Sequence, residues 1–198
     1  YPSKLYLVPM NGLLKEIEKR RAYRALDGRK IPADSIDRII TAATYAPSCA
    51  NMQPWRFLAV SDEPLLTSVK GAVSERNYWV NPAPFIVVVC TKLDYDCERP
   101  EGRDYAYFDT GMAVSNMMLQ GVKEGLHTHP IAGFEPSAMK EVLGIPDDVI
   151  ALAVVVFGYP GDPSTLNEKH LTGENSDRIR KPIGETVVRD KWPESWNK

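Results

Sequence analysis

The sequence of 198 residues predicts one folded domain of the α/β or α+β class. The length is near the common size of a single domain. The apolar fraction of 43% and the charged fraction of 25% are ordinary globular values, which argues against disorder, collagen and coiled coil. Segments with helical spacing alternate along the chain with short, continuously apolar segments, and this alternation is typical of packed helices and buried strands.

Two helices are expected near the N-terminus. Residues 13–21 carry apolar side chains at helical spacing and end in a basic run, which fits a short helix. A second helix begins after Pro32, where Asp34 or Ser35 is expected to cap it. That helix ends near Pro47, because proline cannot continue the hydrogen-bond ladder.

Later segments are more apolar and predict the core. Residues 85–91 are continuously apolar and β-branched, as in a strand covered on both faces. Residues 104–124 form the longest expected helix, and their small and apolar side chains spread over most of its circumference, so it should be central and buried. The other expected elements are strands over residues 55–60, 127–131 and 150–157 and helices over residues 63–70 and 137–143.

From Gly158 onward the chain becomes polar and proline-rich, with little core material. A tail of about forty residues is too long for a loose end in a compact domain. We expect it to wrap its own subunit or a partner subunit. The domain prediction is therefore one unit over residues 1–198 with an extended tail over 160–198.

The composition excludes several classes of partner and site. A formal net charge of −2 provides no bulk field for nucleic acid or an anionic membrane. Surface scaling predicts roughly 9,400 Å² of accessible surface for a compact chain, with about 70% of the unfolded surface buried, so no disulfide or metal is needed for stability. Cys49, Cys90 and Cys97 form neither an even set nor a C-x-x-C pair, and we interpret them as free cysteines of a reducing compartment.

No membrane partner is expected either. The longest apolar run, Ile150–Phe157, is strand-sized, well short of the roughly 20 residues that cross a bilayer. Residues 1–10 lack the charged start and long apolar centre of a signal peptide. We therefore expect a cytoplasmic protein.

The common catalytic and nucleotide-binding motifs are absent. No nucleophile elbow, P-loop or G-x-G-x-x-G is found. His127 and His129 share one face of an expected strand, but two histidines without a third ligand are weak evidence for a metal.

Four short segments have two possible interpretations each. Residues 19–24 are a solvated helix end or a fork of guanidiniums for a phosphate. Residues 47–55 are a turn anchored by a buried tryptophan or a polar loop beside a planar ligand. Residues 130–134 are a bend that needs glycine or a turn whose N–H groups face a ligand. Residues 178–182 are a solvated tail or a second arginine cluster.

In this order the segments resemble the FMN-dependent nitroreductase family over residues 12–190. The resemblance is carried by Arg20-Arg21-x-x-Arg24, Ala46-Pro-Ser-x-x-Asn-x-Gln-Pro-Trp55, Pro130-Ile-x-Gly-Phe134 and Gly158-Tyr-Pro160. It implies a mixed sheet flanked by helices in an intertwined homodimer with FMN at the interface. The long helix would lie in that interface, and the tail would embrace the partner subunit.

The resemblance also implies a set of FMN contacts. The cationic start would bind the phosphate and the ring edge, a polar loop would reach FMN from the partner subunit, and one amide would bond the flavin. A turn would place the Ala132 N–H near flavin N5, and a second basic pair would close on the phosphate. The cationic start is Arg20, Arg21 and Arg24, and the polar loop is Pro47, Ser48 and Asn51. The amide belongs to Asn77, the turn is Pro130, Ile131, Ala132 and Gly133, and the second basic pair is Arg178 and Arg180.

One position departs from the family pattern. Many relatives carry serine where this chain has Ala22, so Ala22 is kept only as a backbone neighbour of FMN. The lost hydroxyl contact costs about 0.5–1.5 kcal/mol, which should not abolish FMN binding.

The activity that the resemblance implies is ping-pong transfer of electrons from NADH or NADPH through FMN to a small oxidised acceptor, such as a nitroaromatic or a quinone. No catalytic side chain is required. The alternatives are a reductive dehalogenase, a flavin-modifying relative, or a flavin-binding module without turnover. Residues 94–103 are either a substrate lid of the dehalogenase kind or a solvated connector.

Overall fold

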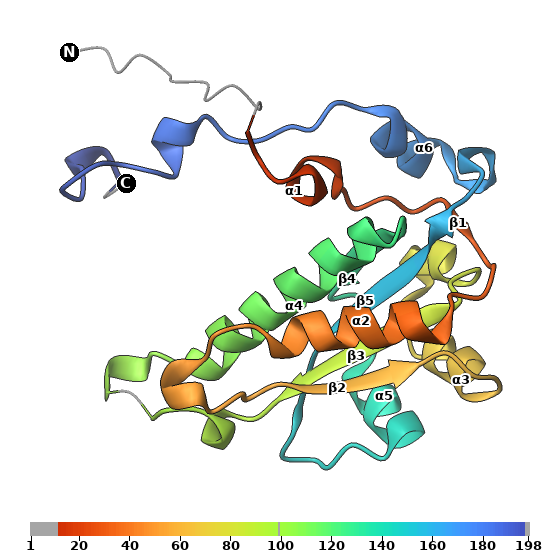
Figure 1. The fold of residues 1–198 in the computed structure, drawn as a ribbon, viewed down its shortest axis with the longest axis horizontal. Helices are drawn as coiled ribbons and strands as arrows, with labels where there is room; N and C mark the ends of the chain where they lie inside the picture. The colour runs from red at the N-terminus through yellow and green to blue at the C-terminus, as the bar shows by residue number, and fades with distance from the viewer. Residues whose placement is uncertain (1–11, 99, 197–198) are drawn as a thin grey trace.

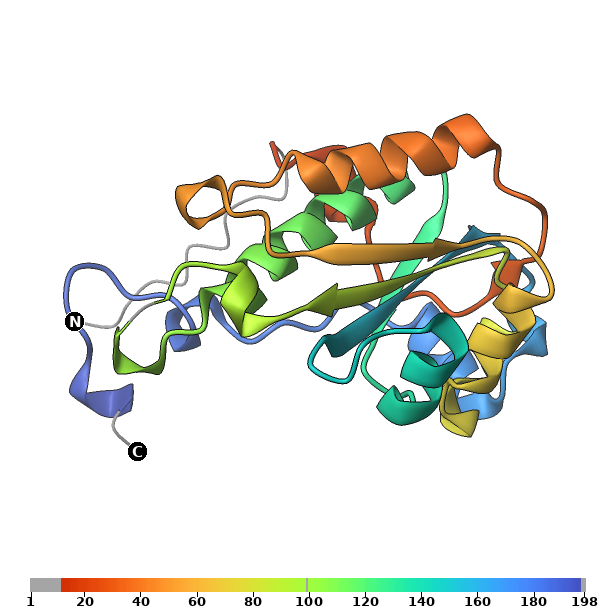
Figure 2. The same cartoon turned by 90° about the horizontal axis from the view of Figure 1, so that it is seen from below.

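The computed structural model describes residues 12–98 and 100–196 and contains a five-stranded sheet with helices on both faces (Figures 1 and 2). The prediction of an α/β fold with flanking helices is confirmed. The expectation about a signal peptide concerns residues 1–10, which lie outside the described residues. None of the helices in the described ranges is long and apolar enough to span a membrane.

The elements follow the predicted order closely. The strands are β1 (Leu26–Asp27), β2 (Arg56–Val60), β3 (Phe85–Thr91), β4 (His127–Ile131) and β5 (Ile150–Pro160). The α-helices are α1 (Lys15–Lys19), α2 (Ala33–Thr44), α3 (Leu65–Gly71), α4 (Tyr105–Lys123), α5 (Pro136–Leu143) and α6 (Glu168–Asn175). Short 3-10 turns cover Cys49–Asn51, Glu75–Val80, Leu93–Tyr95, Pro100–Gly102, Pro163–Thr165, Ile183–Glu185 and Glu194–Trp196.

Strand β5 is the centre of the sheet. It pairs with β3 along one edge and with β4 along the other, and its last two residues pair with β1, while β2 pairs with the outer edge of β3. All four pairings among the described strands are antiparallel, whereas a mixed sheet was expected. The helix α4 links β3 to β4, which run in the same direction, but β5 inserts between them, so these two strands do not pair directly.

The two faces of β3 support two core layers, because successive side chains of a strand point to opposite faces. The odd-numbered side chains from Phe85 to Val89 pack with α2 and α4, and the even-numbered ones from Ile86 to Cys90 pack toward α3 and α5. Figure 2 shows these helix layers on opposite sides of the sheet. Every residue of β3 is buried, which confirms the prediction of a strand covered on both faces.

The start of α2 corrects one expectation. Pro32 occupies the N-cap position, and neither Asp34 nor Ser35 caps the helix with its side chain. Both side chains instead bind Arg38, one turn further on, at 2.7 and 2.9 Å. Arg38 also pairs with Glu124 at the end of α4 at 2.8 Å, so these polar groups tie α2 to α4.

Helix α4 is buried on one side only. Its buried residues include Ala113, Met117 and Gly121, and a Cβ at Gly121 would lie 2.6 Å from a methyl group of Thr128. On another side Tyr107 is 38% exposed and Phe108 is 62% exposed. The prediction of a buried central helix therefore holds for one face, and the other face is open in the single chain.

The C-terminal segment divides into two parts. Residues 163–176 pack on their own chain: the Asn167 N–H donates to the Tyr78 hydroxyl, and the Glu174 carboxylate accepts the N–H groups of Arg24 and Ala25. From residue 177 the chain runs along and beyond the body of the fold (Figure 1). The exposed large apolar side chains of this part are Ile179, Ile183, Val187, Val188 and Trp192.

Candidate functional site

Three arginines from opposite ends of the sequence form a cluster beside the end of α1. Arg20 directly follows this helix, and Arg178 and Arg180 come from the tail. Burial lowers the pKa of Arg20, and the positive charges of Arg178 and Arg180 lower it further. No ion pair of the described residues joins any of the three to a carboxylate. This arginine cluster therefore carries excess positive charge, which suits a phosphate.

Arg178 has a structural role that the sequence did not reveal. Its Nη1 donates to Ile17 O at 3.3 Å, and its Nη2 donates to Glu18 O at 2.5 Å and Arg20 O at 2.8 Å. The carbonyl groups at the end of a helix lack partners within the helix. Arg178 thus holds the end of α1 against the tail, and Arg20 and Arg180 remain the more available cations.

Arg21 and Arg24 are positioned by neighbouring rings. The Arg21 guanidinium donates to Ser176 O at 2.6 Å and lies 5.3 Å from the ring centroid of Tyr23. Arg24 lies 5.9 Å from the ring centroid of Trp79. Arg21 and Tyr23 also line a cavity of about 340 Å³ between the end of α1 and the start of β4. Ala22 is exposed between the two arginines.

The two histidines of β4 hold this arginine-bearing segment. His127 Nδ1 lies 3.2 Å from Ala25 O, and His129 Nδ1 lies 3.0 Å from Tyr23 O. A carbonyl oxygen only accepts a hydrogen bond, so each Nδ1 carries the proton and donates it. The two histidine side chains, on the same face of β4, therefore hold the backbone of residues 23–25 by hydrogen bonds.

Burial keeps both imidazoles neutral at pH 7. It lowers the pKa of His127 and lowers that of His129 to about 4, where the charges of Arg24 and Arg20 contribute as well. The His129 ring also stacks on Trp79 with the centroids 4.4 Å apart. A neutral donor beside several arginines avoids adding another positive charge to the site.

The turn after β4 is built around Gly133. Its carbonyl accepts hydrogen bonds from Asn77 Nδ2 and from the Ser74 N–H, both at 3.0 Å. A Cβ at this position would lie 2.7 Å from Asn77 Nδ2, which explains the glycine. Ala132 is exposed, and no hydrogen bond found among the described residues uses its N–H. The structure thus joins Asn77 to the turn formed by Pro130, Ile131, Ala132 and Gly133.

The loop of residues 47–53, called here the Cys49 loop, lies apart from the arginine cluster. It follows α2 and lies apart from α1 in Figure 1, so one chain does not bring it to the arginine cluster. Ser48 Oγ accepts the Gln53 N–H at 3.0 Å, while Pro47 and Asn51 are exposed. The expectation that Ser48 and Asn51 serve the site of a partner subunit stays a prediction.

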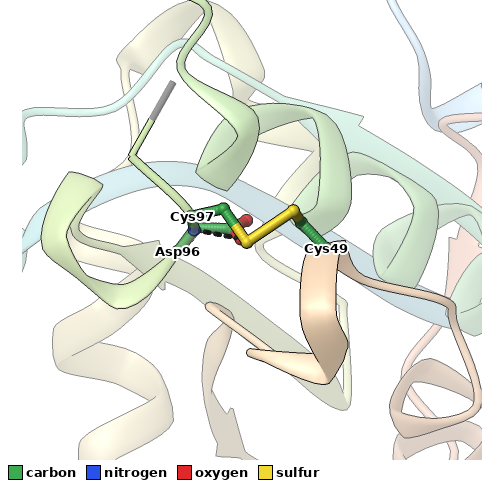
Figure 3. A group of neighbouring side chains, drawn as sticks. All are labelled: Cys49, Asp96 and Cys97. Carbon is green, nitrogen blue, oxygen red and sulfur yellow. Dashed lines mark hydrogen bonds between the residues drawn. A yellow bond between two sulfur atoms is a disulfide. The ribbon is translucent and has the colours of Figure 1, made fainter. Parts of the chain in front are cut away.

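A disulfide corrects the interpretation of the cysteines. Cys49 and Cys97 are bonded to each other, and Asp96 lies beside them (Figure 3). They are 48 residues apart, so no local pattern in the sequence indicates the pair. Cys90 is the free cysteine among the described residues; it is buried in β3, and burial raises its pKa to about 11.

An acidic cavity of about 570 Å³ lies beside this disulfide. Cys97 lines it together with one basic side chain, Arg103, and several carboxylates. The carboxylates are Asp94, Asp96, Glu98 and Asp104. Most of these side chains come from residues 94–103, for which the sequence predicted only a substrate lid or a solvated connector.

Comparisons with known proteins identify the family to which the chain belongs. The sequence profile of the nitroreductase family matches residues 17–77 and 69–159. A protein of Archaeoglobus fulgidus, provisionally named NADH dehydrogenase/NAD(P)H nitroreductase, is 30% identical over 92% of this chain and 100% of its own length. A crystal structure described as an oxidoreductase containing FMN superposes with a TM-score of 0.79 at 26% identity, covering 91% of this chain and 93% of that chain. Human iodotyrosine deiodinase 1 is 29% identical over 95% of this chain and 72% of its own length. This chain belongs to the nitroreductase family of oxidoreductases.

Proposed function

We propose that the protein binds FMN and transfers electrons from NADH or NADPH to a small oxidised acceptor, such as a nitroaromatic or a quinone. The observation that carries the proposal is the arginine cluster, in which Arg20, Arg178 and Arg180 meet without a carboxylate partner among the described ion pairs. A dianionic phosphate balances such a cluster through charge-assisted hydrogen bonds. The names of the relatives above support the same cofactor and donors.

Residues already placed by the fold would hold the cofactor. Arg20 and Arg180 would bind the phosphate, with Arg178 keeping the end of α1 in position. The Ala132 N–H would face the ring, because Asn77 and Gly133 hold the turn that presents it. When bound, FMN supplies the redox chemistry, accepting electrons from the nicotinamide donor and passing them to the acceptor. The protein supplies binding, orientation and positive charge.

We propose a homodimer as the functional unit. A single chain separates the Cys49 loop from the arginine cluster, and it leaves Phe108 and the apolar side chains of the tail exposed. Burial of these surfaces between two copies would bring Ser48 and Asn51 to the FMN of the partner subunit.

The visible absorption spectrum tests the cofactor. Protein incubated with FMN and then desalted should keep a flavin band, and the Arg20→Gln variant should lose most of it because the phosphate loses a cation. A flat spectrum from correctly folded wild-type dimer would remove the cofactor assignment. For the loaded enzyme, double-reciprocal plots at several donor concentrations should be parallel, as a shared-site ping-pong scheme requires.

Reductive dehalogenation is a second candidate function. Several relatives are iodotyrosine deiodinases, including a Haliscomenobacter hydrossis protein that is 26% identical over 74% of this chain. The acidic cavity beside Arg103 offers both signs of charge, which a zwitterionic amino acid requires. This second function would be favoured if the enzyme released halide from a halotyrosine at a higher rate than it reduced nitroaromatics and quinones.

A further inference from the structure

The Cys49 loop has a backbone conformation that needs external support. Ala50, Asn51 and Gln53 have φ values of 47°, 59° and 51°. This left-handed region is unfavourable for residues other than glycine, although asparagine tolerates it better than most. Three such residues within four positions disfavour the loop in isolation, so contacts with the rest of the chain must hold it.

Two attachments to the rest of the chain hold Cys49 itself. The buried Asp109 carboxylate on α4 accepts the Cys49 N–H at 2.6 Å. The Cys49 side chain is bonded to Cys97, from the segment that follows β3 (Figure 3). The hydrogen bonds described for Ser48 and Asn51 lie within the loop, so they do not attach it to the fold.

The segment that carries Cys97 is attached to neighbouring elements through Lys92 and Tyr95. Lys92 pairs with Asp148 at 2.9 Å, just before β5 begins. The Arg56 guanidinium lies 4.5 Å from the ring centroid of Tyr95. The Cys97 N–H donates to the buried Asp96 carboxylate at 2.7 Å. The disulfide thus joins a loop that needs support to a segment that the sheet and its neighbours hold in place.

We propose that the Cys49–Cys97 disulfide is a reversible redox latch that controls FMN affinity by holding the Cys49 loop. The inference rests on the proposed function, in which Ser48 and Asn51 of this loop contact the FMN of the partner subunit. A cellular dithiol opens the latch: two electrons and two protons from the dithiol convert the S–S bond into two thiols, and the dithiol becomes a disulfide. Cys97 lines the 570 Å³ cavity, which gives the reductant access.

Reduction changes the loop and leaves the core intact. The Asp109 hydrogen bond to Cys49 remains, but the covalent attachment is lost, and the residues with positive φ relax toward ordinary conformations. Ser48 and Asn51 lose their fixed positions, so FMN binding has to order them again, and this cost lowers the affinity for FMN. The core of β3, β5 and α4 contains neither half-cystine, and it should remain folded.

The first experiment compares FMN affinity in the two redox states. Wild-type protein is oxidised with glutathione disulfide, or reduced with dithiothreitol and desalted without oxygen, and each form is titrated with FMN while flavin fluorescence is recorded. We expect the oxidised form to bind about fivefold tighter or more. Cys49→Ser and Cys97→Ser should bind like the reduced form and ignore the reductant. Cys90→Ala is the matched control and should respond like wild type.

A second measurement uses the reciprocity of linkage. If the oxidised form binds FMN more tightly, saturating FMN must favour the disulfide by the same factor. Mass spectrometry after alkylation measures the disulfide fraction in glutathione buffers with and without FMN. A shift in the midpoint that matches the affinity ratio supports the latch without any assay of activity.

Each other outcome has a distinct meaning. Three alkylatable thiols in the oxidised protein, or equal FMN affinity in both redox states, would overturn the latch and leave the proposed function in place. Absence of FMN binding in both states would overturn the proposed function and the latch with it. If the serine variants fail to fold, the wild-type comparison still decides the question.

Discussion

Gly133 is the residue of the candidate site with the least room for change. Gly133→Ala would place a Cβ 2.7 Å from Asn77 Nδ2 and push away the amide that bonds the Gly133 carbonyl. We expect the free energy of unfolding to fall by about 1–2 kcal/mol, and FMN affinity to fall as the turn shifts. Denaturant unfolding and FMN titration measure the two effects.

Gly71→Ala is the matched control for this substitution. Gly71 ends α3, has no positive φ and has nothing within 4 Å of the new Cβ. Its stability should therefore stay the same or rise slightly, since alanine loses less conformational freedom on folding. Equal losses of stability in the two variants would show that the Asn77 contact does not matter.

His129 makes the stability of the fold depend on pH. Its pKa in the folded chain is about 4, against an ordinary value of 6.5, so between these values the unfolded chain binds more protons. The contribution is fully present above pH 6.5 and is lost as the pH falls toward 4. We expect a loss of about 2 kcal/mol between pH 7 and pH 5 from this residue. Denaturant unfolding at the two pH values measures it.

His129→Asn separates titration from hydrogen bonding. The asparagine amide can donate to Tyr23 O in place of Nδ1, but it does not titrate. The variant should therefore lose less stability than wild type between pH 7 and pH 5. An unchanged pH dependence would mean that other groups, such as His127 and His170, carry the effect.

At the scale of elements, the contact between α1 and the tail organises the arginine cluster. Helix α1 has five residues and no buried side chain, so its own packing contributes little. The Arg178 guanidinium reaches three carbonyl groups at its end, and Arg21 reaches Ser176 O. These contacts bring two arginine-bearing segments from opposite ends of the chain together.

Arg178→Ala should therefore weaken FMN binding by removing both a cation and the contact that orients α1. We expect the Kd for FMN to rise about tenfold or more, because hydrogen bonds from a charged group contribute about 1.5–3 kcal/mol. Arg178→Lys should fall between the alanine variant and wild type, since it keeps the charge but not the fork. Fluorescence titration with FMN measures all three proteins.

Arg189→Ala is the charge-matched control in the same tail. Arg189 is exposed, and its side chain has no hydrogen bond or ion pair among those described. FMN affinity should be unchanged in this variant. A similar loss of FMN affinity in both variants would mean that Arg178 contributes only through its positive charge.

At the scale of the whole molecule, the exposed apolar surface predicts self-association. Phe108 on α4 is 62% exposed, so Phe108→Glu should leave the monomer fold intact and weaken the dimer. Sedimentation at several concentrations should show a dimer for wild type and dissociation for the variant. Leu65→Glu, on the opposite layer at α3 and 42% exposed in wild type, should sediment like wild type. A stable wild-type monomer loaded with flavin would contradict the proposed dimer.

The elements with strong local patterns were predicted closely. Strand β3 has the expected bounds, and α4 is one residue shorter at each end than expected, because apolar content and periodicity act over a few residues. Helix α6 was missed, since its residues are polar and only Leu166 and Leu171 nearby reach the core. The available signal was Asn167, whose side chain caps α6 by accepting the His170 N–H.

The sequence by itself determined the order of the elements, the apolar strands of the core, and the segments that place the chain in its family, because each depends on neighbouring residues. It did not determine the Arg178 contacts with α1, the Asn77 contact that requires Gly133, or the neutral state of His129. Nor did it reveal the Cys49–Cys97 bond. Only the tertiary structure decided these, since each depends on groups that are far apart in the chain and meet when the fold buries them or brings their surfaces into contact.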